Sequence, residues 1–396
     1  MGIDTFAEKI VTDSSNNIYI AGGFCTNREG PIFNVKFNEY GQKLWNSTWK
    51  LNNSTKYITD LTVDTEQNIY NLVNFYFPDL SVLMKINNSG KSIWNKTIDG
   101  LANNIYIDEY DNIYVSGEKF NHKNDKVNIF LKKFNSDGKS QWNHSFVLDN
   151  IIDSYGFPCT MMVDHLNQTY VAGIISTRSW SFSFGNFWGA PIIFTCVYNS
   201  SGYLLSFDYW NMQNNYISST MIFDTFGNLY LMGADKEITQ NIIFKYDSSW
   251  HLNTTIADWQ NDAIVGTSDV WESIFIDNSK NIYCAGINSF FSGNEIYLVK
   301  FNSSGHLEFD GAWNNLSITW CYDIHVDSEL NIYVSALTGI GIYNQRALIL
   351  KNPVLGEFSN PPTPIDIPYI ISISSIVFVC GMAGIYFIIH FRRRSL

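Results

Sequence analysis

Aromatic side chains cluster in the segments of this sequence that vary most between its repeats. One segment, residues 174–190, contains Trp180, Phe184 and Trp188, together with Phe182 and Phe187. Two shorter clusters are Phe75-Tyr76-Phe77 and Phe290-Phe291. Exposed aromatic rings stack on sugar rings or anchor a protein partner. We therefore predict Phe75, Tyr76, Phe77, Trp180, Phe184, Trp188, Phe290 and Phe291 as ligand-binding residues, with packing against neighbouring loops as the alternative.

Catalytic and metal-binding patterns are weak by comparison. The seven histidines show no ligand spacing, and the six cysteines form no C-x-x-C pair. There is no G-x-S-x-G nucleophile turn and no P-loop. The sequence therefore predicts no catalytic residue, no metal site and no cofactor.

Three Gly-x-x-x-Trp turns keep an enzyme open as the alternative. They span residues 41–45, 90–94 and 138–142, and they resemble the tryptophan-docking turns of quinoprotein dehydrogenases. No adjacent cysteine pair accompanies them, so packing of tryptophan between repeats is the favoured interpretation. A quinoprotein-like oxidoreductase, a glycan-active enzyme and a purely structural cell-envelope protein are the rival functions.

The net charge of −12 excludes nucleic acid as a favoured partner, because phosphate binding needs clustered Lys and Arg.

Residues 367–391 carry no formal charge and are followed by Arg392-Arg393-Arg394. A helix of this length could cross a bilayer, and the positive-inside rule places the tail 392–396 in the cytoplasm. We predict a single-pass anchor in the lipid bilayer of the cell membrane, a Pro-containing linker at 359–366 and an extracellular body.

Eleven Asn-x-Ser/Thr sequons agree with an exported body, although an Asn- and Ser-rich chain also forms them by chance. Eight of these sequons are the candidate N-glycosylation sites, namely Asn46, Asn53, Asn95, Asn143, Asn199, Asn253, Asn302 and Asn315. Residues 1–13 have neither a basic nor an apolar signal region. We expect the signal, and a strand that closes the ring of repeats, to lie upstream of Met1.

The elements that position these residues come from seven repeats. The pattern Asp-x-x-x-Asn/Gln-Ile/Leu/Thr-Tyr starts at Asp13, Asp64, Asp108, Asp164, Asp224, Asp277 and Asp327. Each Asp is placed to accept backbone N–H groups at the start of a tight turn, and the fourth position favours residues that tolerate φ > 0. A strand with Lys follows in six repeats, and then in five an Asn-x-x-Gly turn.

Four short strands in roughly 50 residues, repeated, are the pattern of a propeller blade. The sequence therefore predicts an all-β fold, a seven-bladed β-propeller over residues 1–358, with a C-terminal transmembrane helix over 367–391. Only residues 357–359 separate the last strand pattern from Pro361-Pro362, so a full fourth strand in the seventh blade is doubtful.

The motifs D-S-S-N-N-I-Y-I-A-G (13–22), D-N-S-K-N-I-Y-C-A-G (277–286) and K-F-N-S-D-G-K-S-Q-W (133–142) resemble the seven-bladed β-propeller repeat family of bacterial and archaeal surface and secreted proteins. The resemblance implies the fold and little about activity, because these motifs are turns and strands. The predicted function is a membrane-anchored binding or scaffold module for an extracellular protein or carbohydrate. Function is expected at the blade end that carries the variable connections.

Overall fold

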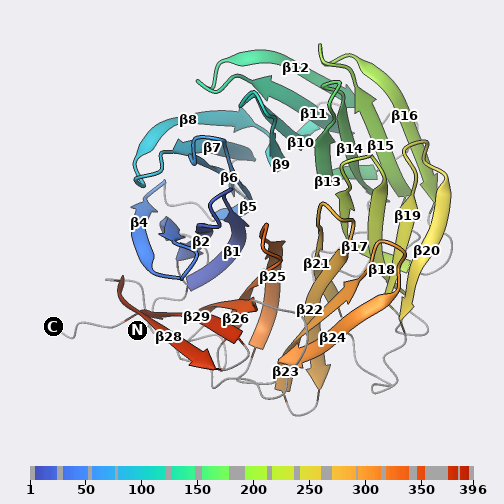
Figure 1. The fold of residues 1–396 in the computed structure, drawn as a ribbon. Helices are drawn as coiled ribbons and strands as arrows, with labels where there is room; N and C mark the ends of the chain where they lie inside the picture. The colour runs from blue at the N-terminus through green and yellow to red at the C-terminus, as the bar shows by residue number, and fades with distance from the viewer. Residues whose placement is uncertain are drawn as a thin grey trace.

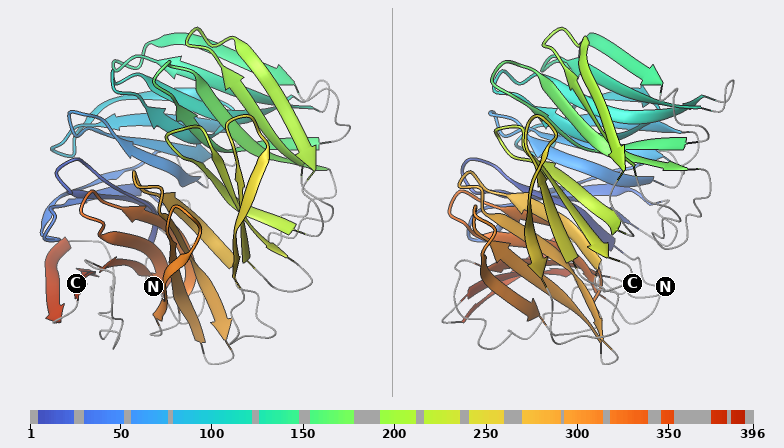
Figure 2. Two further views of the ribbon diagram at one scale, coloured as in Figure 1. Left: turned by 45° about the vertical axis from the view of Figure 1, so that its right-hand side comes forward. Right: turned by 90° about the vertical axis from the view of Figure 1, so that its right-hand side faces the viewer.

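The structure is a computed structural model of the whole chain. It describes residues 5–24, 30–51, 56–75, 79–121, 126–147, 154–177, 192–211, 216–235, 241–259, 270–290, 293–313, 318–338, 346–352, 373–381 and 384–391. These residues form antiparallel sheets arranged around a common centre (Figure 1). Neighbouring sheets lie face to face, as in a propeller (Figure 2).

Six repeats form four-stranded sheets whose strands follow one another in chain order, and we number these blades along the chain. Blade 1 consists of β1 (Thr5–Thr12), β2 (Ile18–Phe24), β3 (Ile32–Phe37) and β4 (Lys43–Trp49). Blade 2 consists of β5 (Lys56–Val63), β6 (Ile69–Phe75), β7 (Leu80–Ile86) and β8 (Ser92–Asp99). Blade 3 consists of β9 (Leu101–Ile107), β10 (Ile113–Asn121), β11 (Lys126–Phe134) and β12 (Ser140–Val147).

Blade 4 consists of β13 (Ser154–Val163), β14 (Thr169–Thr177), β15 (Ile192–Tyr198) and β16 (Leu204–Asn211). Blade 5 consists of β17 (Tyr216–Phe223), β18 (Leu229–Asp235), β19 (Asn241–Tyr246) and β20 (Leu252–Trp259). Blade 6 consists of β21 (Val270–Ile276), β22 (Ile282–Phe290), β23 (Gly293–Phe301) and β24 (Leu307–Trp313). In every blade the first strand lies nearest the centre and the fourth forms the outer edge (Figure 1).

The seventh repeat differs from the prediction. Its sheet has three strands in the part of the chain that the structure describes, β25 (Ile318–Val326), β26 (Ile332–Thr338) and β27 (Arg346–Asn352). Seven four-stranded blades is therefore wrong, because six blades have four strands. The sequence itself did not favour a full fourth strand here, because Pro361-Pro362 follow closely and proline cannot donate to a strand ladder.

The predicted helix over 367–391 is also wrong. The structure has two antiparallel strands here, β28 (Ile373–Gly381) and β29 (Gly384–Phe391). Ile, Val and Phe dominate both segments, and these residues suit strands as well as an apolar helix, so the length of an apolar run does not separate the two. Among the described residues, no helix is long and apolar enough to cross a membrane.

The seven aspartates act as the sequence predicted. Asp13 Oδ1 accepts the backbone N–H groups of Ser15 and Asn17, both at 2.9 Å. Its Oδ2 accepts the Tyr19 hydroxyl at 2.9 Å. The fourth residue of each turn has positive φ, including residues that tolerate it poorly, namely Gln67 (65°), Lys280 (64°) and Leu330 (65°). The same Asp–Tyr hydrogen bond recurs in all seven repeats.

The repeated lysine completes this unit. The Lys85 ammonium lies 3.1 Å from Asp64 Oδ2 and 5.1 Å from the centre of the Tyr70 ring. Lysines over tyrosine rings recur at Lys36, Lys133, Lys245 and Lys300. In the repeats that carry the lysine, the motif is thus a hydrogen-bonded structural unit, and it explains the repeated Asp, Tyr and Lys without catalysis.

Apolar clusters fill the spaces between blades. The cluster between blades 1 and 2, for example, contains Tyr19 and Ile32 from one blade and Ile69, Val73 and Met84 from the next. Equivalent clusters lie between each following pair of sheets up to the seventh. This packing between neighbouring sheets holds the blades in a ring, and the ring fixes the strand ends from which the connecting segments start.

Candidate functional site

Most of the predicted aromatic site cannot be placed. Tyr76, Phe77, Trp180, Phe184, Trp188 and Phe291 lie outside the described residues. Phe290 is the last residue of β22. Phe75 is 2% exposed and packs in the cluster between blades 1 and 2, so it belongs to the core and not to a binding surface. As the last residue of β6, it completes a run of seven buried residues.

The three Gly-x-x-x-Trp turns dock one blade on the next. Trp45 Nε1 donates to the Asn88 carbonyl at 2.6 Å, Trp94 Nε1 to Ser136 at 3.3 Å, and Trp142 Nε1 to Ser200 at 3.3 Å. Each acceptor lies in a turn of the following blade. This confirms packing between repeats, the favoured interpretation of these tryptophans.

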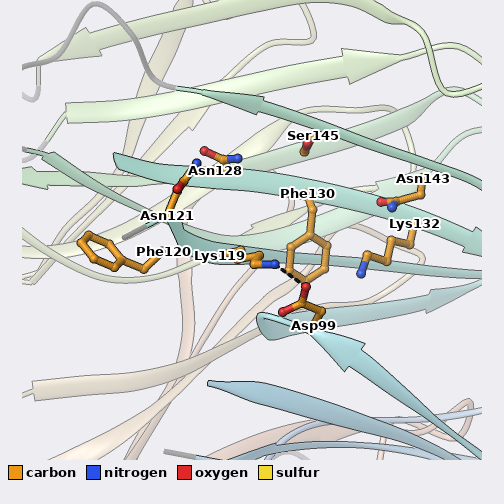
Figure 3. Close-up of a pocket in the computed structure, with 9 residues that line it drawn as sticks. All are labelled: Asp99, Lys119, Phe120, Asn121, Asn128, Phe130, Lys132, Asn143 and Ser145. Carbon is orange, nitrogen blue, oxygen red and sulfur yellow. Dashed lines mark hydrogen bonds and ion pairs between the residues drawn. The ribbon is translucent and has the colours of Figure 1, made fainter. Parts of the chain in front are cut away.

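A cavity of about 550 Å³ lies where blades 2 and 3 meet. We call it the blade 2–3 pocket, and its lining residues are Asp99, Lys119, Phe120, Asn121, Asn128, Phe130, Lys132, Asn143 and Ser145 (Figure 3). A volume of this size is within the usual range for small-molecule sites. Asp99 and Asn121 end β8 and β10, at the blade end opposite the Asp turns, where the sequence predicted function.

The register of blade 3 explains how these side chains converge. Lys119 pairs with Asn128 across β10 and β11, and Lys132 pairs with Asn143 across β11 and β12. Alternate residues of a strand share one face, so Asn128, Phe130 and Lys132 point to the same side of β11. Figure 3 shows the Phe130 ring between the ends of the Lys119 and Lys132 side chains.

Two glycines leave the room that the Phe130 ring occupies. A Cβ at Gly117 would lie 2.4 Å from Phe130 Cζ and 2.3 Å from the Leu101 carbonyl oxygen. Gly100, between β8 and β9, has φ of 112°, and a Cβ there would lie 2.9 Å from Phe130 Cε1. Any side chain at either position would displace the aromatic floor of the pocket.

The two lysines of the pocket differ in their pairing and in their exposure to solvent. The Lys119 ammonium pairs with Asp99 Oδ2, and both side chains are well exposed (Figure 3). Lys132 lies with its ammonium 4.6 Å from the centre of the Phe130 ring. Burial lowers the pKa of Lys132, with Lys119 adding to this effect and Asp99 opposing it. One half-buried cation therefore lacks a carboxylate partner among the described residues.

Asn128 brings an unsatisfied hydrogen-bond acceptor to the pocket lining. Its Oδ1 is buried and has no hydrogen-bond partner in the described part of the chain. Leaving a buried acceptor unpaired costs on the order of 1–3 kcal/mol. The side chains that the pocket offers to a ligand are the amide of Asn143 and the hydroxyl of Ser145, both of which are exposed.

Sequence reasoning missed this pocket, although Lys132 carries a signal. It directly precedes the repeated Lys133, and the same position in the other six repeats is apolar: Val35, Met84, Cys196, Phe244, Val299 and Leu350. A charged residue in a position that otherwise packs between blades is costly to keep. Comparing the repeats column by column would have identified it.

The candidate glycosylation sites fall into groups. Asn46, Asn95 and Asn143 are exposed on the outer strands β4, β8 and β12. Asn199 and Asn302 begin turns, where their Oδ1 atoms accept two backbone N–H groups each. Asn253 lies on β20. Asn53 and Asn315 lie outside the described residues.

No known family profile matches the chain, and no curated protein matches its sequence. Solved structures do match its fold. A puromycin hydrolase superposes with a TM-score of 0.57 at 9% identity, covering 88% of this chain and 52% of the hydrolase. This chain therefore spans about half the length of that enzyme.

Two further matches cover nearly the whole of both chains. The polysaccharide lyase Uly1 has a TM-score of 0.55 at 9% identity, over 87% of this chain and 89% of the lyase. The β-propeller domain of the Trilobed protease from Pyrococcus furiosus, described as having an open velcro topology, has a TM-score of 0.50 at 10% identity, over 88% and 94%. Identities this low establish a β-propeller fold and nothing about activity.

Proposed function

We propose that the protein is a binding module and that the blade 2–3 pocket takes a hydroxyl-rich ligand with one negative charge, such as an acidic sugar unit of a glycan. The observation that carries the proposal is the half-buried ammonium of Lys132, which forms no ion pair with a described carboxylate and lies beside an aromatic ring and several amides. A ligand carboxylate or sulfate would pair with Lys132, and sugar hydroxyls would hydrogen-bond the exposed side chains of Asn143 and Ser145.

The pocket supports binding better than acid–base catalysis. Among the described residues that line it, one is a carboxylate, Asp99, and it already pairs with Lys119. Glycoside hydrolysis by the common mechanism needs two carboxyl groups about 5–10 Å apart. An enzyme remains the alternative proposal, since peptidase and lyase structures share the fold. The solved lyase and hydrolase are similar to this chain in fold alone.

Binding is tested by calorimetric titration of the protein with short oligosaccharides of two kinds, neutral ones and ones containing uronate or sulfate. We expect affinity for the acidic set only, and a loss of at least tenfold in Lys132→Met. Met stands at the equivalent position of blade 2, as Met84, so the variant suits the fold. Lys91→Met, at an exposed lysine in the turn between β7 and β8, is the matched control. Equal affinity for neutral and acidic oligosaccharides would refute the proposal. Cleavage of the oligosaccharide during the titration would also refute it, because the protein would then be an enzyme.

Attachment to a membrane is a separate proposal. Its support is the uncharged run 367–391 followed by three arginines. The full chain is expected to sediment with membranes and to resist alkaline carbonate, whereas a chain ending at residue 358 is released. If both chains are released, the proposed localisation is wrong.

A further inference from the structure

Three sequons occupy one structural position. Asn46, Asn95 and Asn143 each follow a docking tryptophan on the outer strand of blades 1, 2 and 3. They pair across the sheet with Val35, Met84 and Lys132, which are themselves equivalent. The three sites are therefore in register and not scattered as chance sequons would be.

At each of the three sites, the asparagine amide and the sequon hydroxyl are placed where a glycosylating enzyme can reach both. The sequon hydroxyls belong to Thr48, Thr97 and Ser145, two residues after the asparagine. Alternate strand residues share a face, so amide and hydroxyl lie together, and all six residues are exposed. In blades 1 and 2 the residue two before the asparagine is an exposed apolar one, Leu44 (52%) or Ile93 (49%), which a sugar bound next to it would cover.

The outer strands are also unpaired edges, since each bonds to one neighbour only. Natural proteins protect such edges, and charge is one means. In blade 6 the position equivalent to Asn46 is Asp310, which pairs with Val299, and the exposed Glu308 precedes it. A glycan at the sequon asparagines of blades 1 to 3 would serve the same purpose that charge serves in blade 6.

Asn143 differs from the other two because it lines the blade 2–3 pocket together with Ser145 and Lys132. We propose that Asn46, Asn95 and Asn143 are N-glycosylated and that the glycan on Asn143 covers the blade 2–3 pocket. The masking part rests on the proposed function, whereas the modification itself does not. Glycan occupancy at Asn143 then sets the fraction of molecules that bind ligand.

The reaction requires a lipid diphosphate-linked oligosaccharide as donor and a membrane oligosaccharyltransferase as catalyst. The Asn143 amide nitrogen forms a bond to the anomeric carbon of the sugar. The bond from that carbon to the diphosphate breaks, the lipid diphosphate leaves with the electron pair, and the amide nitrogen loses one proton. No redox change occurs.

The test begins with the full chain made in a host that performs N-glycosylation and in one that does not. Mass spectrometry of proteolytic peptides measures occupancy at each asparagine. We expect a glycan on Asn46, Asn95 and Asn143 in the first host. An unmodified Asn143 in protein that carries glycans elsewhere would overturn the proposal.

Masking is measured by the rate of chemical acetylation of Lys132, which needs no ligand. The rate should be at least fivefold slower in the glycosylated protein, and Asn143→Gln or Ser145→Ala made in the same host should restore it. Asn46→Gln and Asn95→Gln are the matched controls and should leave the rate slow. An equal rate in glycosylated and unglycosylated protein would show that the pocket stays open.

The acidic oligosaccharide used above separates the two proposals. If the unglycosylated protein fails to bind it, the proposed function is wrong, and the occupancy and acetylation results still decide the present inference. If the unglycosylated protein binds it and the glycosylated protein binds equally well, the masking is wrong and the function stands.

Discussion

Lys132 is costly to the fold. Its ammonium is half-buried and burial lowers its pKa, while the six equivalent residues are apolar. Lys132→Met exchanges a charge for an apolar side chain that packs against Phe130. We expect the free energy of unfolding to rise by about 1 kcal/mol, measured by urea denaturation. A purely structural lysine would instead give a loss of stability.

The aspartates of the turns differ in how deeply they are buried. Asp64 holds Lys85, whose side chain is 8% exposed, and Asp64 Oδ1 and Oδ2 both accept hydrogen bonds. Asp64→Ala leaves this lysine buried without its carboxylate partner, and only the Ser136 carbonyl at 3.4 Å still accepts a hydrogen bond from it. The expected loss is about 3–5 kcal/mol of unfolding free energy, the range for breaking a buried ion pair.

Asp277→Ala is the matched control for Asp64→Ala. Asp277 makes the same hydrogen bonds to its turn, to Asn281 and to Tyr283, but it is less buried than Asp64. The loss should be smaller by at least 1 kcal/mol, because the equivalent lysine, Lys300, pairs with Glu308 at 2.7 Å, and because water can replace part of what is removed at this more accessible site. Equal losses in the two variants would mean that the hydrogen bonds to the turn, and not the ion pair, account for the cost.

At the scale of the element, the turn between β25 and β26 contains a strained residue. Leu330 has φ of 65° and is 40% exposed, so its side chain contributes little packing that would compensate. A left-handed conformation costs a residue with a Cβ roughly 1–2 kcal/mol, and asparagine tolerates it better. Leu330→Asn should raise the melting temperature, measured by calorimetry. Leu330→Ala keeps the strain and should not.

The turns and inner strands could be predicted because the signal for them is local. Asp at the first position, a residue of the left-handed region at the fourth and a buried Tyr after it specify one hairpin, and seven copies specify a propeller. Even Gln67, Lys280 and Leu330, which suit the fourth position poorly, adopt positive φ there. The rest of each repeat is consistent enough to impose the turn.

The seventh sheet, the C-terminal hairpin and the pocket could not be predicted, each for a different physical reason. In the seventh repeat the sequence left the fourth strand in doubt, because only residues 357–359 precede Pro361-Pro362, but it did not decide between three strands and four. In residues 367–391, apolar composition does not distinguish helix from strand. The blade 2–3 pocket depends on Asp99 and Lys132, which lie 33 positions apart and meet only once adjacent blades pack.

At the scale of the whole molecule, the ring closes through side chains. The inner strand β1 contacts β25 and β26 of the seventh sheet. Asp323 Oδ2 accepts the Ile10 N–H at 3.1 Å, and Ser328 donates to Asn16 at 2.9 Å. Lys9 lies 3.9 Å from Asp323 Oδ1. In the described residues no strand of one terminus joins the sheet of the other, so these contacts hold the first and last repeats together.

Two ionisable groups near this closure respond to acid in opposite directions. Burial raises the pKa of Asp60 to about 6, with Lys9 opposing the rise. Burial lowers the pKa of His325 to about 4, and this ring lies 5.0 Å from Phe275 and 3.0 Å, through Nε2, from Thr12 Oγ1. Between pH 6.5 and 4, the folded state takes up a proton at Asp60, whereas the unfolded chain takes one up at His325.

The signs follow from linkage. Acidification from pH 6.5 to 4 should stabilise the fold by up to about 3 kcal/mol through Asp60 and destabilise it by a similar amount through His325. The two effects nearly cancel in the unaltered protein. His325→Gln removes the destabilising part, so this variant should gain stability relative to the unaltered protein as the pH falls. Asp60→Asn should lose stability over the same range.

Chemical denaturation at several pH values measures both variants against the unaltered protein. Taking differences removes the contributions of the other carboxylates, which are common to all three proteins. His306→Gln, an exposed histidine in the turn between β23 and β24, is the control and should follow the unaltered protein. If the His325→Gln and His306→Gln curves coincide, the pKa of His325 is not lowered by burial, and this part of the pH dependence is wrong.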